Sequence, residues 1–591
     1  MARSHKRKSS RPAKSHWFAL LASLAIVGVI ASIVVVKWPR EKLAEQYVRR
    51  PSGSVTFNKD IAPIIFQHCA ICHHPGQAAP FALLTYADVK KRAEQIAEVT
   101  QRRFMPPWLP EPGHVRYLGE RLLTAQELGL IQQWAEEGAI EGPPGDLPPA
   151  PRWTNHWQLG TPDLVIEMPE PFAVPAEGKD IYRNFAIPIP LAAARHVDAV
   201  EFRPGNPKVV HHAAMRLDRT RYSRRLDDKD PGPGFAGMSL PETTEVPSGD
   251  FLNWQPGKLP YRAPPGLGWT LEPDTDFVLQ LHLHPTGKPE EVRSEIGFYF
   301  TERAPAHKTF KIILDWPAID IPAGASNYVI EDRYLLPVEV EALAVFPHAH
   351  YVAKEMQAYA QLPDGSRQWL LWIKDWDFNW QGDYRFAKPL RLPKGTALHM
   401  RFTYDNSTNN VRNPNQPPQR VVFGPQTTDE MGEVWLQVLP HNHADLTTLA
   451  RDYNVTTVQK TVAVNQQRLH RDPADKRAHL QIGKALFILG RPREAQPYFL
   501  AAVQRQPEHD EPHYFLGLIR RMEQQFGPAR EEFETALRLN PANYKAHGNL
   551  GLIFLDQGEL SLAETHFRAA LELNPQDTIA RKSLESLLKN K

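Results

Sequence analysis

The sequence predicts a multidomain protein. We expect an N-terminal transmembrane helix, a small all-α domain, two all-β sandwich domains of jelly-roll type and a C-terminal α-helical solenoid. Three observations lead to this fold class. Residues 17–36 form an apolar run, residues 153–443 form short alternating segments between turns, and a 34-residue repeat begins at Ala478. With 591 residues the chain is too long for one core, since a domain holds roughly 150 residues.

The composition is that of a folded protein and excludes one class of partner. The chain is 42% hydrophobic, and its formal net charge of +2 is nearly neutral for this length. Proteins that bind nucleic acids carry a marked basic excess, so we expect no nucleic-acid partner. Only two cysteines are present, three positions apart, so no disulfide framework can brace the other domains.

The N-terminal segment, residues 1–40, is predicted to anchor the protein in a membrane. Residues 1–16 are basic and contain no acidic residue, and the apolar run after them is long enough to cross a bilayer as a helix. Trp17 and Trp38 flank this run, as aromatic residues do at membrane interfaces. We expect a single-pass protein of the bacterial inner membrane with most of the chain in the periplasm. A cleaved signal peptide is the alternative, although the run is longer than a usual signal.

Residues 52–145 are predicted to form a small helical domain, which a Pro-rich stretch from Gly142 to Pro151 separates from the β region. Helices are expected at 60–66, 86–102 and 124–137. Cys69, Cys72 and His73 form a C-x-x-C-H motif, the pattern of covalent c-type haem attachment.

In this motif the two thiols would bond the haem, and His73 would ligate its iron. A zinc site would need two further ligands nearby, and a thioredoxin-like site would need a βαβ setting, and neither is present. We therefore predict a cytochrome c domain that carries haem c. Met105, between Phe104 and Pro106, is the expected sixth ligand, because a Pro-flanked loop would hold its thioether in place. The alternatives to Met105 are His68 and His74.

The C-terminal region, residues 470–591, is a repeat array. Equivalent positions recur every 34 residues, and the units begin at Ala478, Pro512, Ala546 and Ala580. Within the first three units a glycine, an alanine, a phenylalanine and a proline recur at matching positions. This pattern resembles the tetratricopeptide repeat, which implies a helical solenoid. We expect the array to bind a partner protein and to carry no chemistry.

Histidine pairs and one methionine stand in apolar surroundings of the β region. They are His211 and His212, His282 and His284, His348 and His350, and Met431. Side chains at i and i+2 of a strand share a face, so His348 and His350 can chelate one metal. Adjacent residues such as His211 and His212 point apart, and could share a metal only at a bulge or a distorted strand end. One such pair alone is more often solvated, but imidazoles with a thioether suit copper, because sulfur favours Cu(I).

The order H-H, L-x-H-x-H, H-x-H and D-E-M resembles the copper type II, ascorbate-dependent monooxygenases, the family of peptidylglycine hydroxylating monooxygenase and dopamine β-monooxygenase. Residues 403–407 are similar to a segment of bacterial relatives of that family, and the resemblance covers roughly residues 155–445. It implies two sandwich domains, at 153–305 and 306–447, with a copper ion in each on either side of a cleft. The region has no cysteine, unlike the disulfide-braced eukaryotic enzymes, so packing alone must stabilise it.

The resemblance also assigns the ligands of the two copper ions. The electron-supplying copper would be held by His211, His212 and His282, with His284 as the rival third imidazole. The oxygen-activating, catalytic copper would be held by His348, His350 and Met431.

Together these features predict a membrane-anchored monooxygenase that uses O2 to hydroxylate a C–H bond of an unknown organic substrate. Haem c would pass electrons to the copper pair from a respiratory, periplasmic or ascorbate-like donor. One alternative is a non-catalytic electron carrier or copper-binding protein assembled through its repeats. Another is a haem sensor, which a six-coordinate iron disfavours.

Overall fold

The structure, a computed structural model, describes residues 47–75, 79–151, 157–238, 240–241, 243–247 and 250–589. The predicted transmembrane helix lies outside these residues. Within the described part of the chain, no helix is long and apolar enough to cross a membrane.

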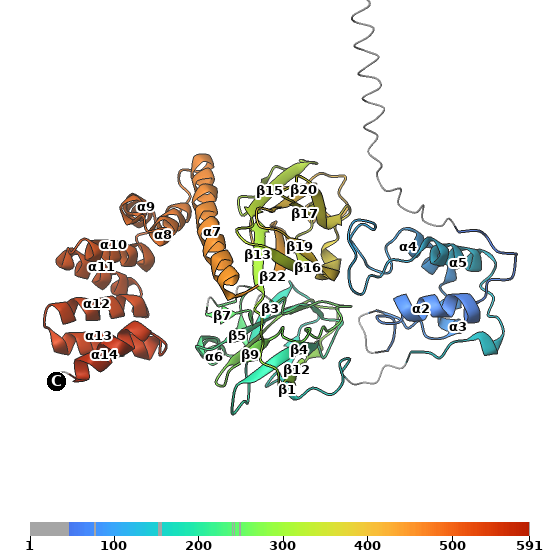
Figure 1. The fold of residues 1–591 in the computed structure, drawn as a ribbon, viewed down its shortest axis with the longest axis horizontal. Helices are drawn as coiled ribbons and strands as arrows, with labels where there is room; N and C mark the ends of the chain where they lie inside the picture. Colours follow the sequence, from blue (N-terminus) through green and yellow to red (C-terminus); the bar gives the residue numbers. More distant parts are fainter. Residues whose placement is uncertain are drawn as a thin grey trace, which may run out of the picture.

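Three blocks follow one another along the molecule (Figure 1). A small group of helices lies at one end, a β-rich region occupies the centre, and a stack of helices forms the other end. Helix α7 (His443–Arg471) stands between the β-rich region and the stack. The β-rich centre and the helical C-terminus of the predicted fold class are therefore confirmed.

The N-terminal helices enclose a core of their own, which includes Phe57, Ile65 and Trp134. The elements are η1 (Phe57–Ile61), α2 (Ala62–His68), α3 (Tyr86–Lys90), α4 (Ala93–Gln101), α5 (Ala125–Glu136) and η2 (Pro144–Asp146). The helix predicted at 86–102 is interrupted between α3 and α4. Arg92 leaves helical geometry there, with φ −124° and ψ 17°, and its guanidinium lies 3.9 Å above the Phe81 ring.

The first half of the β region is built from antiparallel sheets over one core. One sheet has the order β1 (Leu164–Glu167), β12 (Glu295–Thr301), β4 (Arg195–Arg203), β9 (Trp269–Leu271). The other has the order β6 (Phe235–Ala236), β3 (Ile181–Pro188), β10 (Asp276–Leu283), β5 (Val210–Asp218), β7 (Thr244–Glu245), with β8 (Asn253–Trp254) also on β5. Strands β2 (Phe172–Val174) and β11 (Glu290–Val292) form a separate pair, and α6 (Tyr222–Asp227) comes after β5. Phe298 of the first sheet and Leu279 of the second are buried in the shared core.

The second half repeats this plan. One sheet has the order β13 (Phe310–Asp315), β22 (Gly432–Pro440), β16 (Val340–Ala349), β19 (Tyr384–Leu392). The other has the order β15 (Tyr328–Leu335), β20 (Ala397–Tyr404), β17 (Ala353–Gln361), β18 (Arg367–Ile373). The remaining elements are η4 (Phe378–Trp380), β14 (Asp320–Ile321) and β21 (Val421–Val422). Val345 and Phe402 are fully or almost fully buried where the two sheets meet.

The loop between α4 and α5 fixes the N-terminal helices to the second sandwich. The Tyr117 hydroxyl donates to the Leu370 carbonyl at 2.8 Å, and its ring is part of the core of that sandwich. The backbone of this loop also donates to the carbonyls of Trp372 (2.7 Å) and Arg385 (2.8 Å). The position of the C-x-x-C-H motif relative to the β region is thus set by buried contacts.

The C-terminal stack consists of helices in pairs. They are α8 (Ala478–Ile488), α9 (Pro492–Arg505), α10 (Asp510–Met522), α11 (Phe526–Leu539), α12 (Tyr544–Asp556), α13 (Leu560–Leu573) and α14 (Thr578–Lys589). A Cβ placed on Gly517 would lie 2.7 Å from the Phe533 ring, and the equivalent glycines one repeat before and after face their own phenylalanines in the same way. The phased glycine and phenylalanine therefore mark one contact, where paired helices cross too closely for a side chain.

We expect Gly517→Ala to lower the free energy of unfolding of the repeats by about 1 kcal/mol. Overpacking against a buried ring costs roughly 1–3 kcal/mol, and the higher helix propensity of alanine returns about 1 kcal/mol. Urea unfolding followed by circular dichroism at 222 nm measures the change. Gly527→Ala is the matched control, because nothing lies within 4 Å of a Cβ there. Its unfolding free energy should be unchanged or rise, and equal effects of the two variants would contradict the proposed crossing.

Candidate metal centre

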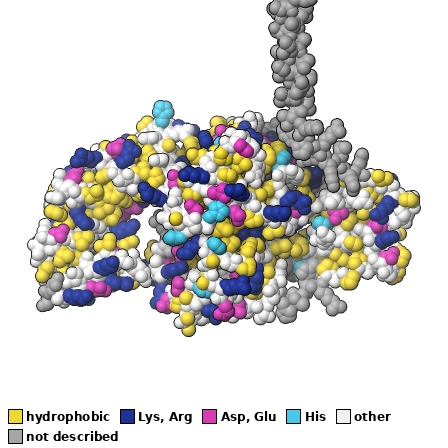
Figure 2. All heavy atoms as spheres, in the orientation of Figure 1, with side chains coloured by type: hydrophobic (Ala, Val, Ile, Leu, Met, Phe, Trp, Pro, Cys, Tyr) yellow, Lys and Arg dark blue, Asp and Glu magenta, His cyan; other side chains and the backbone are white. Residues whose placement is uncertain are grey.

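A cleft of about 560 Å³ lies between the two sandwiches. His211 and His212 line it from the first sandwich, and His348, His350 and Met431 line it from the second. Histidine side chains are visible on the central β region in Figure 2. The structure thus brings five of the six predicted copper-ligand residues to one cavity. The sixth, His282, does not line the cavity but has its Nδ1 atom 3.2 Å from that of His212.

A bulge in β5 brings His211 and His212 together. His282 of β10 faces His212, but the next residue, Leu283, faces Val210, so His211 is an extra residue without a register partner. A bulge redirects side chains that would otherwise point to opposite faces. This is the distortion that two adjacent histidines need in order to share a metal.

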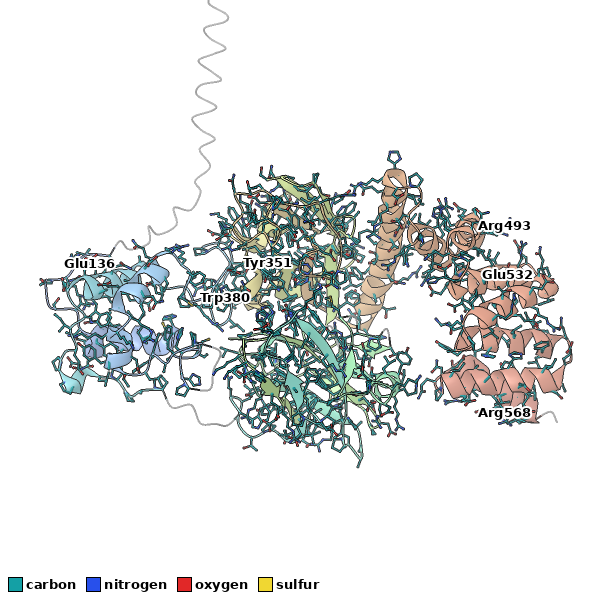
Figure 3. All side chains as sticks on the ribbon, turned by 180° about the vertical axis from the view of Figure 1, so that it is seen from behind. Glu136, Tyr351, Trp380, Arg493, Glu532 and Arg568 are labelled. Atoms are coloured by element: carbon teal, nitrogen blue, oxygen red, sulfur yellow. The ribbon has the colours of Figure 1, made fainter. Side chains whose placement is uncertain are left out.

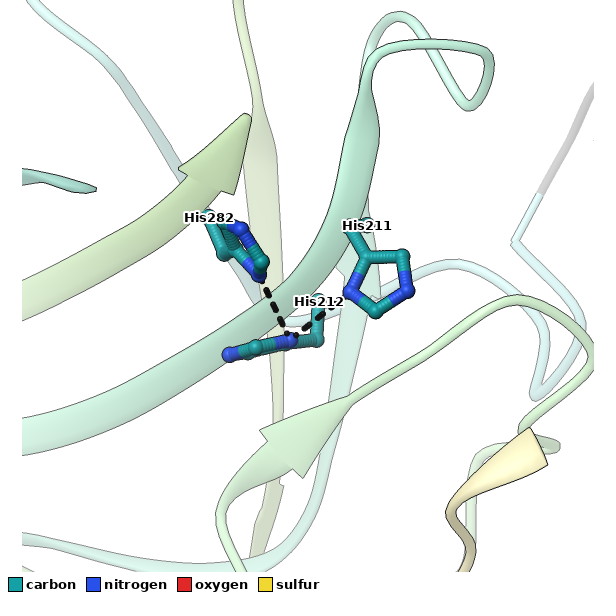
Figure 4. Close-up of side chains that lie close together, drawn as sticks. All are labelled: His211, His212 and His282. Carbon is teal, nitrogen blue, oxygen red and sulfur yellow. Dashed lines mark hydrogen bonds between the residues drawn. The ribbon is translucent and has the colours of Figure 1, made fainter. Parts of the chain in front are cut away.

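Three imidazole nitrogens converge at this bulge (Figure 4). The Nδ1 of His212 lies 3.2 Å from the Nδ1 of His211 and 3.2 Å from the Nδ1 of His282. An imidazole nitrogen has either one proton or one lone pair, so His212 Nδ1 cannot form a hydrogen bond with both neighbours. A metal ion bonded to three nitrogens at about 2.0 Å would separate them by roughly 3.3–3.5 Å. The spacing therefore fits one shared cation.

Burial favours the neutral forms of His211 and His212. Burial, together with the neighbouring histidines, lowers the pKa of His211 to about 4 and the pKa of His212 well below the usual value. Neutral imidazole is the form that binds a metal.

Asp180 contacts both candidates for the third imidazole, but only one of them also faces His212. One carboxylate oxygen lies 2.7 Å from His282 Nε2, which leaves His282 Nδ1 to face the other two histidines. The Tyr182 ring stacks on His282 with centroids 4.3 Å apart and fixes the plane of the imidazole. His284 is bound to the other oxygen of Asp180, and 66% of its side chain is exposed. His282 belongs to the cluster, and His284 does not.

We expect Asp180→Ala to weaken the affinity of this cluster for Cu(I) by about 10- to 100-fold, the usual cost of removing a group that orients a ligating histidine. Titration against a Cu(I) chelator measures it. His284→Ala is the matched control and should change the affinity less than Asp180→Ala, because His284 touches the same carboxylate from the solvent side. A larger loss in His284→Ala would make His284 the third ligand instead.

His348 and His350 present their other nitrogens to the cleft. His348 Nδ1 donates to Gln381 Oε1 at 2.6 Å, and His350 Nδ1 donates to the Asp429 carbonyl at 3.1 Å. Both Nε2 atoms therefore keep their lone pairs for a cation. The centroids of the two imidazole rings are 5.3 Å apart. Burial lowers the pKa of His350 to about 3.

Met431 is held beside these histidines through its backbone. Its amide donates to the buried carboxylate of Glu430 at 2.8 Å, and its carbonyl accepts from the Tyr404 hydroxyl at 2.8 Å. Glu430 also accepts from the amides of His350 and of Val352. One carboxylate thus joins the strand end that carries His350 to the segment that carries Met431.

Phe378 lies between the two groups of candidate ligands. Its ring centroid is 5.7 Å from that of His211 and 5.7 Å from that of His350. It belongs to η4, whose last residue, Trp380, lies on the side of the β region towards the N-terminal helices (Figure 3).

The C-x-x-C-H motif begins where α2 ends. Cys69 and Cys72 are not joined in a disulfide, and burial raises the pKa of the Cys69 thiol to about 12. His73 Nδ1 donates to the Phe81 carbonyl at 3.1 Å, which fixes the ring and leaves Nε2 as the ligating atom. This arrangement could hold an iron on His73.

The predicted sixth ligand and its alternatives occupy different surroundings. Met105 lines a small cavity with Arg121 and is half-buried. His68 Nε2 lies 3.2 Å from a Glu127 carboxylate oxygen, and His74 Nδ1 lies 2.9 Å from the Ala70 carbonyl.

Arg121 connects the cysteine motif to the first sandwich. Its guanidinium donates to the Gly257 carbonyl. Burial raises the pKa of the Cys72 thiol, and the positive charge of Arg121 opposes this shift. A Cβ on Gly257 would lie 3.4 Å from Cys72 Sγ. A second cavity of about 260 Å³ begins at this contact, and Gln255 and Gln381 line both this cavity and the cleft.

The residues that orient the candidate ligands were not predicted from the sequence. Glu430 stands next to Met431 within the D-E-M motif, so its position could have indicated a role. Asp180, Gln381 and Phe378 are distant in sequence from the histidines that they contact, and no local pattern marks them.

One part of the chain matches a known family. A tetratricopeptide repeat family model matches residues 480–527 and 520–578. The C-terminal helices are tetratricopeptide repeats. This confirms the predicted array and supports a protein partner, because such repeats commonly mediate protein–protein interactions.

Two solved structures of MamA are similar to a part of this chain. One is 21% identical and covers 25% of this chain and 84% of its own, with a TM-score of 0.22. The other is 22% identical and covers 23% and 73%, with a TM-score of 0.21. No curated protein matches the chain.

Proposed function

We propose that the protein is a copper-dependent monooxygenase that hydroxylates a C–H bond of an organic substrate with O2. His211, His212 and His282 would hold one copper ion, and a second would be held by His348, His350 and Met431. The two ions would supply O2 activation and electrons, and haem c on Cys69, Cys72 and His73, with Met105 as sixth ligand, would relay electrons from a respiratory, periplasmic or ascorbate-like donor.

The observation that carries this proposal is the single cleft with two different donor sets. One set offers three Nδ1 atoms and no sulfur, and the other offers two Nε2 atoms beside a thioether. Sulfur favours Cu(I), so the two ions would differ in redox properties. A division between an electron-supplying ion and an oxygen-binding ion follows from that difference.

The residues around the cleft prepare it for this chemistry. Asp180 and Gln381 each fix the tautomer and the orientation of a ligating histidine. Phe251, Phe346 and Trp435 pack together and give the cleft an apolar wall. An apolar wall beside the candidate ligands would hold an apolar part of a substrate there.

The docking of the N-terminal helices supports the electron-supply role. Cys72 lies against Gly257, three residues after Trp254. Trp254 lines the cleft and pairs with Ala213, the residue after His212. A short stretch of chain therefore connects the cysteine motif to the first candidate copper site.

The remaining parts of the proposal concern location. The membrane anchor at residues 1–40 would place the haem and copper domains in the periplasm, where c-type haem is attached. The repeats would recruit a partner protein, with the electron donor as one candidate.

The test is metal content combined with oxygen consumption by the purified full-length protein. We expect two coppers and one covalent haem per chain, and O2 uptake that requires both copper and a reductant. Removal of copper with a chelator should abolish the uptake, and added copper should restore it. Substoichiometric copper with unchanged haem would instead favour an electron carrier that does not act on O2.

A further inference from the structure

One cation, Arg216, lines the cleft, and a second, Lys311, lies over the ring of Trp435, another residue of the cleft wall. Arg216 lines the cleft from β5 and is buried enough to lower its pKa to about 10. Its Nη1 donates to the Met215 carbonyl at 3.2 Å. Among the described residues, no carboxylate oxygen lies within 4 Å of the Arg216 guanidinium, whereas Arg219 on the same chain segment is paired with Glu245 at 2.9 Å.

The position of Arg216 relates it to the candidate copper site. His212, Ala214 and Arg216 are two residues apart in turn, so they share one face of β5. All three line the cleft. With a rise of about 3.3 Å per residue, Arg216 stands roughly 13 Å along the strand from His212.

The second cation approaches from the other sandwich. Lys311 of β13 lies 4.2 Å above the Trp435 ring, which lines the cleft. Burial, and to a smaller extent the positive charge of Arg216, lower the pKa of Lys311 to about 8 against the opposing effect of Glu433. Glu433 accepts a hydrogen bond from the Trp435 indole at 2.7 Å. Glu433 also lines the cleft, so this part of the cleft holds one carboxylate beside the two cations.

The wall between these cations and the candidate ligands is apolar and aromatic. Phe251 and Phe346 have ring centroids 6.2 Å apart, and Phe346 and Trp435 have centroids 5.2 Å apart. An apolar cleft that Arg216 lines without a carboxylate partner, and whose Trp435 wall carries Lys311, fits a molecule with an apolar body and one anionic end. Binding of the anion would relieve the repulsion between Arg216 and Lys311.

We propose that Arg216 and Lys311 bind the carboxylate of the substrate, and that the substrate is an organic acid whose apolar body lies along Phe251, Phe346 and Trp435. This inference rests on the proposed function, because it takes the cleft as the place of the reaction. The acid must be longer than acetate, since its reacting carbon has to reach from the cations to the candidate ligands.

The test uses 6-phenylhexanoate and its neutral analogue 6-phenylhexanamide as probes. Isothermal titration of the full-length protein should show that the acid binds at least about tenfold more tightly than the amide, as hydrogen bonds to charged groups give. Arg216→Gln and Lys311→Gln should each remove most of this preference, and Arg216→Lys should retain part of it. Arg219→Gln is the matched control and should bind both probes as the original protein does.

Two results would overturn the inference. One is equal or undetectable binding of the two probes, and the other is a preference for the acid that survives in Arg216→Gln. Copper content and O2 uptake, measured on the same samples, separate this failure from failure of the proposed function. A protein that binds two coppers and consumes O2 without preferring the acid contradicts the inference alone. A protein that prefers the acid but binds no copper contradicts the monooxygenase and leaves the carboxylate site in place.

Discussion

Replacing Met431 by isoleucine is expected to reduce O2 uptake at least a hundredfold while most of the copper at the histidine trio stays bound. Isoleucine is similar in volume but has no sulfur, so the change removes one donor of the proposed oxygen-binding ion. Loss of a supporting group alone costs about 10- to 100-fold, and loss of a ligand should cost more. An oxygen electrode with chemically reduced full-length protein measures the rate, and metal analysis gives the copper content.

Met356→Ile is the matched control for this experiment. Met356 is fully buried in the core of the same sandwich and is not part of the cleft lining, so its substitution tests packing alone. We expect O2 uptake close to that of the original protein. If both variants lose activity equally, the effect of Met431→Ile is one of folding. If neither does, Met431 is not a ligand. His348→Ala should reproduce the loss seen in Met431→Ile.

Cys72→Ala is expected to remove most of the stable covalent haem and to leave copper binding intact. The thiol of Cys72 would form one of two thioether bonds, and its loss leaves attachment to Cys69 alone. The candidate copper ligands lie on the two sandwiches, whose cores are separate from the core of the N-terminal helices next to Cys72, so the metal content of the β region should not change. Haem spectra after denaturation measure the covalent fraction.

This variant also tests the electron supply. With an external donor that requires the haem, O2 uptake should fall to the background rate. After direct chemical reduction of copper, one turnover should still occur. Uptake from the external donor at the original rate would contradict a haem relay, and loss of copper together with haem would contradict independent domains.

The structure differs from the sequence prediction mainly where distant segments meet. The 34-residue period predicted the repeats correctly, because the contact between Gly517 and Phe533 recurs within each unit and leaves a local signature. The predicted helix at 86–102 is two helices, since Arg92 leaves helical geometry between them and lies over the Phe81 ring, a contact that has no periodic pattern in the sequence. The choice between His282 and His284 remained open in the sequence, since i and i+2 residues of a strand are equivalent until a partner is known.

The sequence by itself determined the features whose chemistry is local. Spacing alone marks the C-x-x-C-H motif and the candidate ligands His348 and His350, and periodicity alone marks the repeats. Only the tertiary structure decided which histidines converge. The bulge at His211 depends on pairing with β10, and the orientation of His282 depends on Asp180, which is 102 residues away. Such contacts arise from packing between strands far apart in the chain, and for that reason no local pattern predicts them.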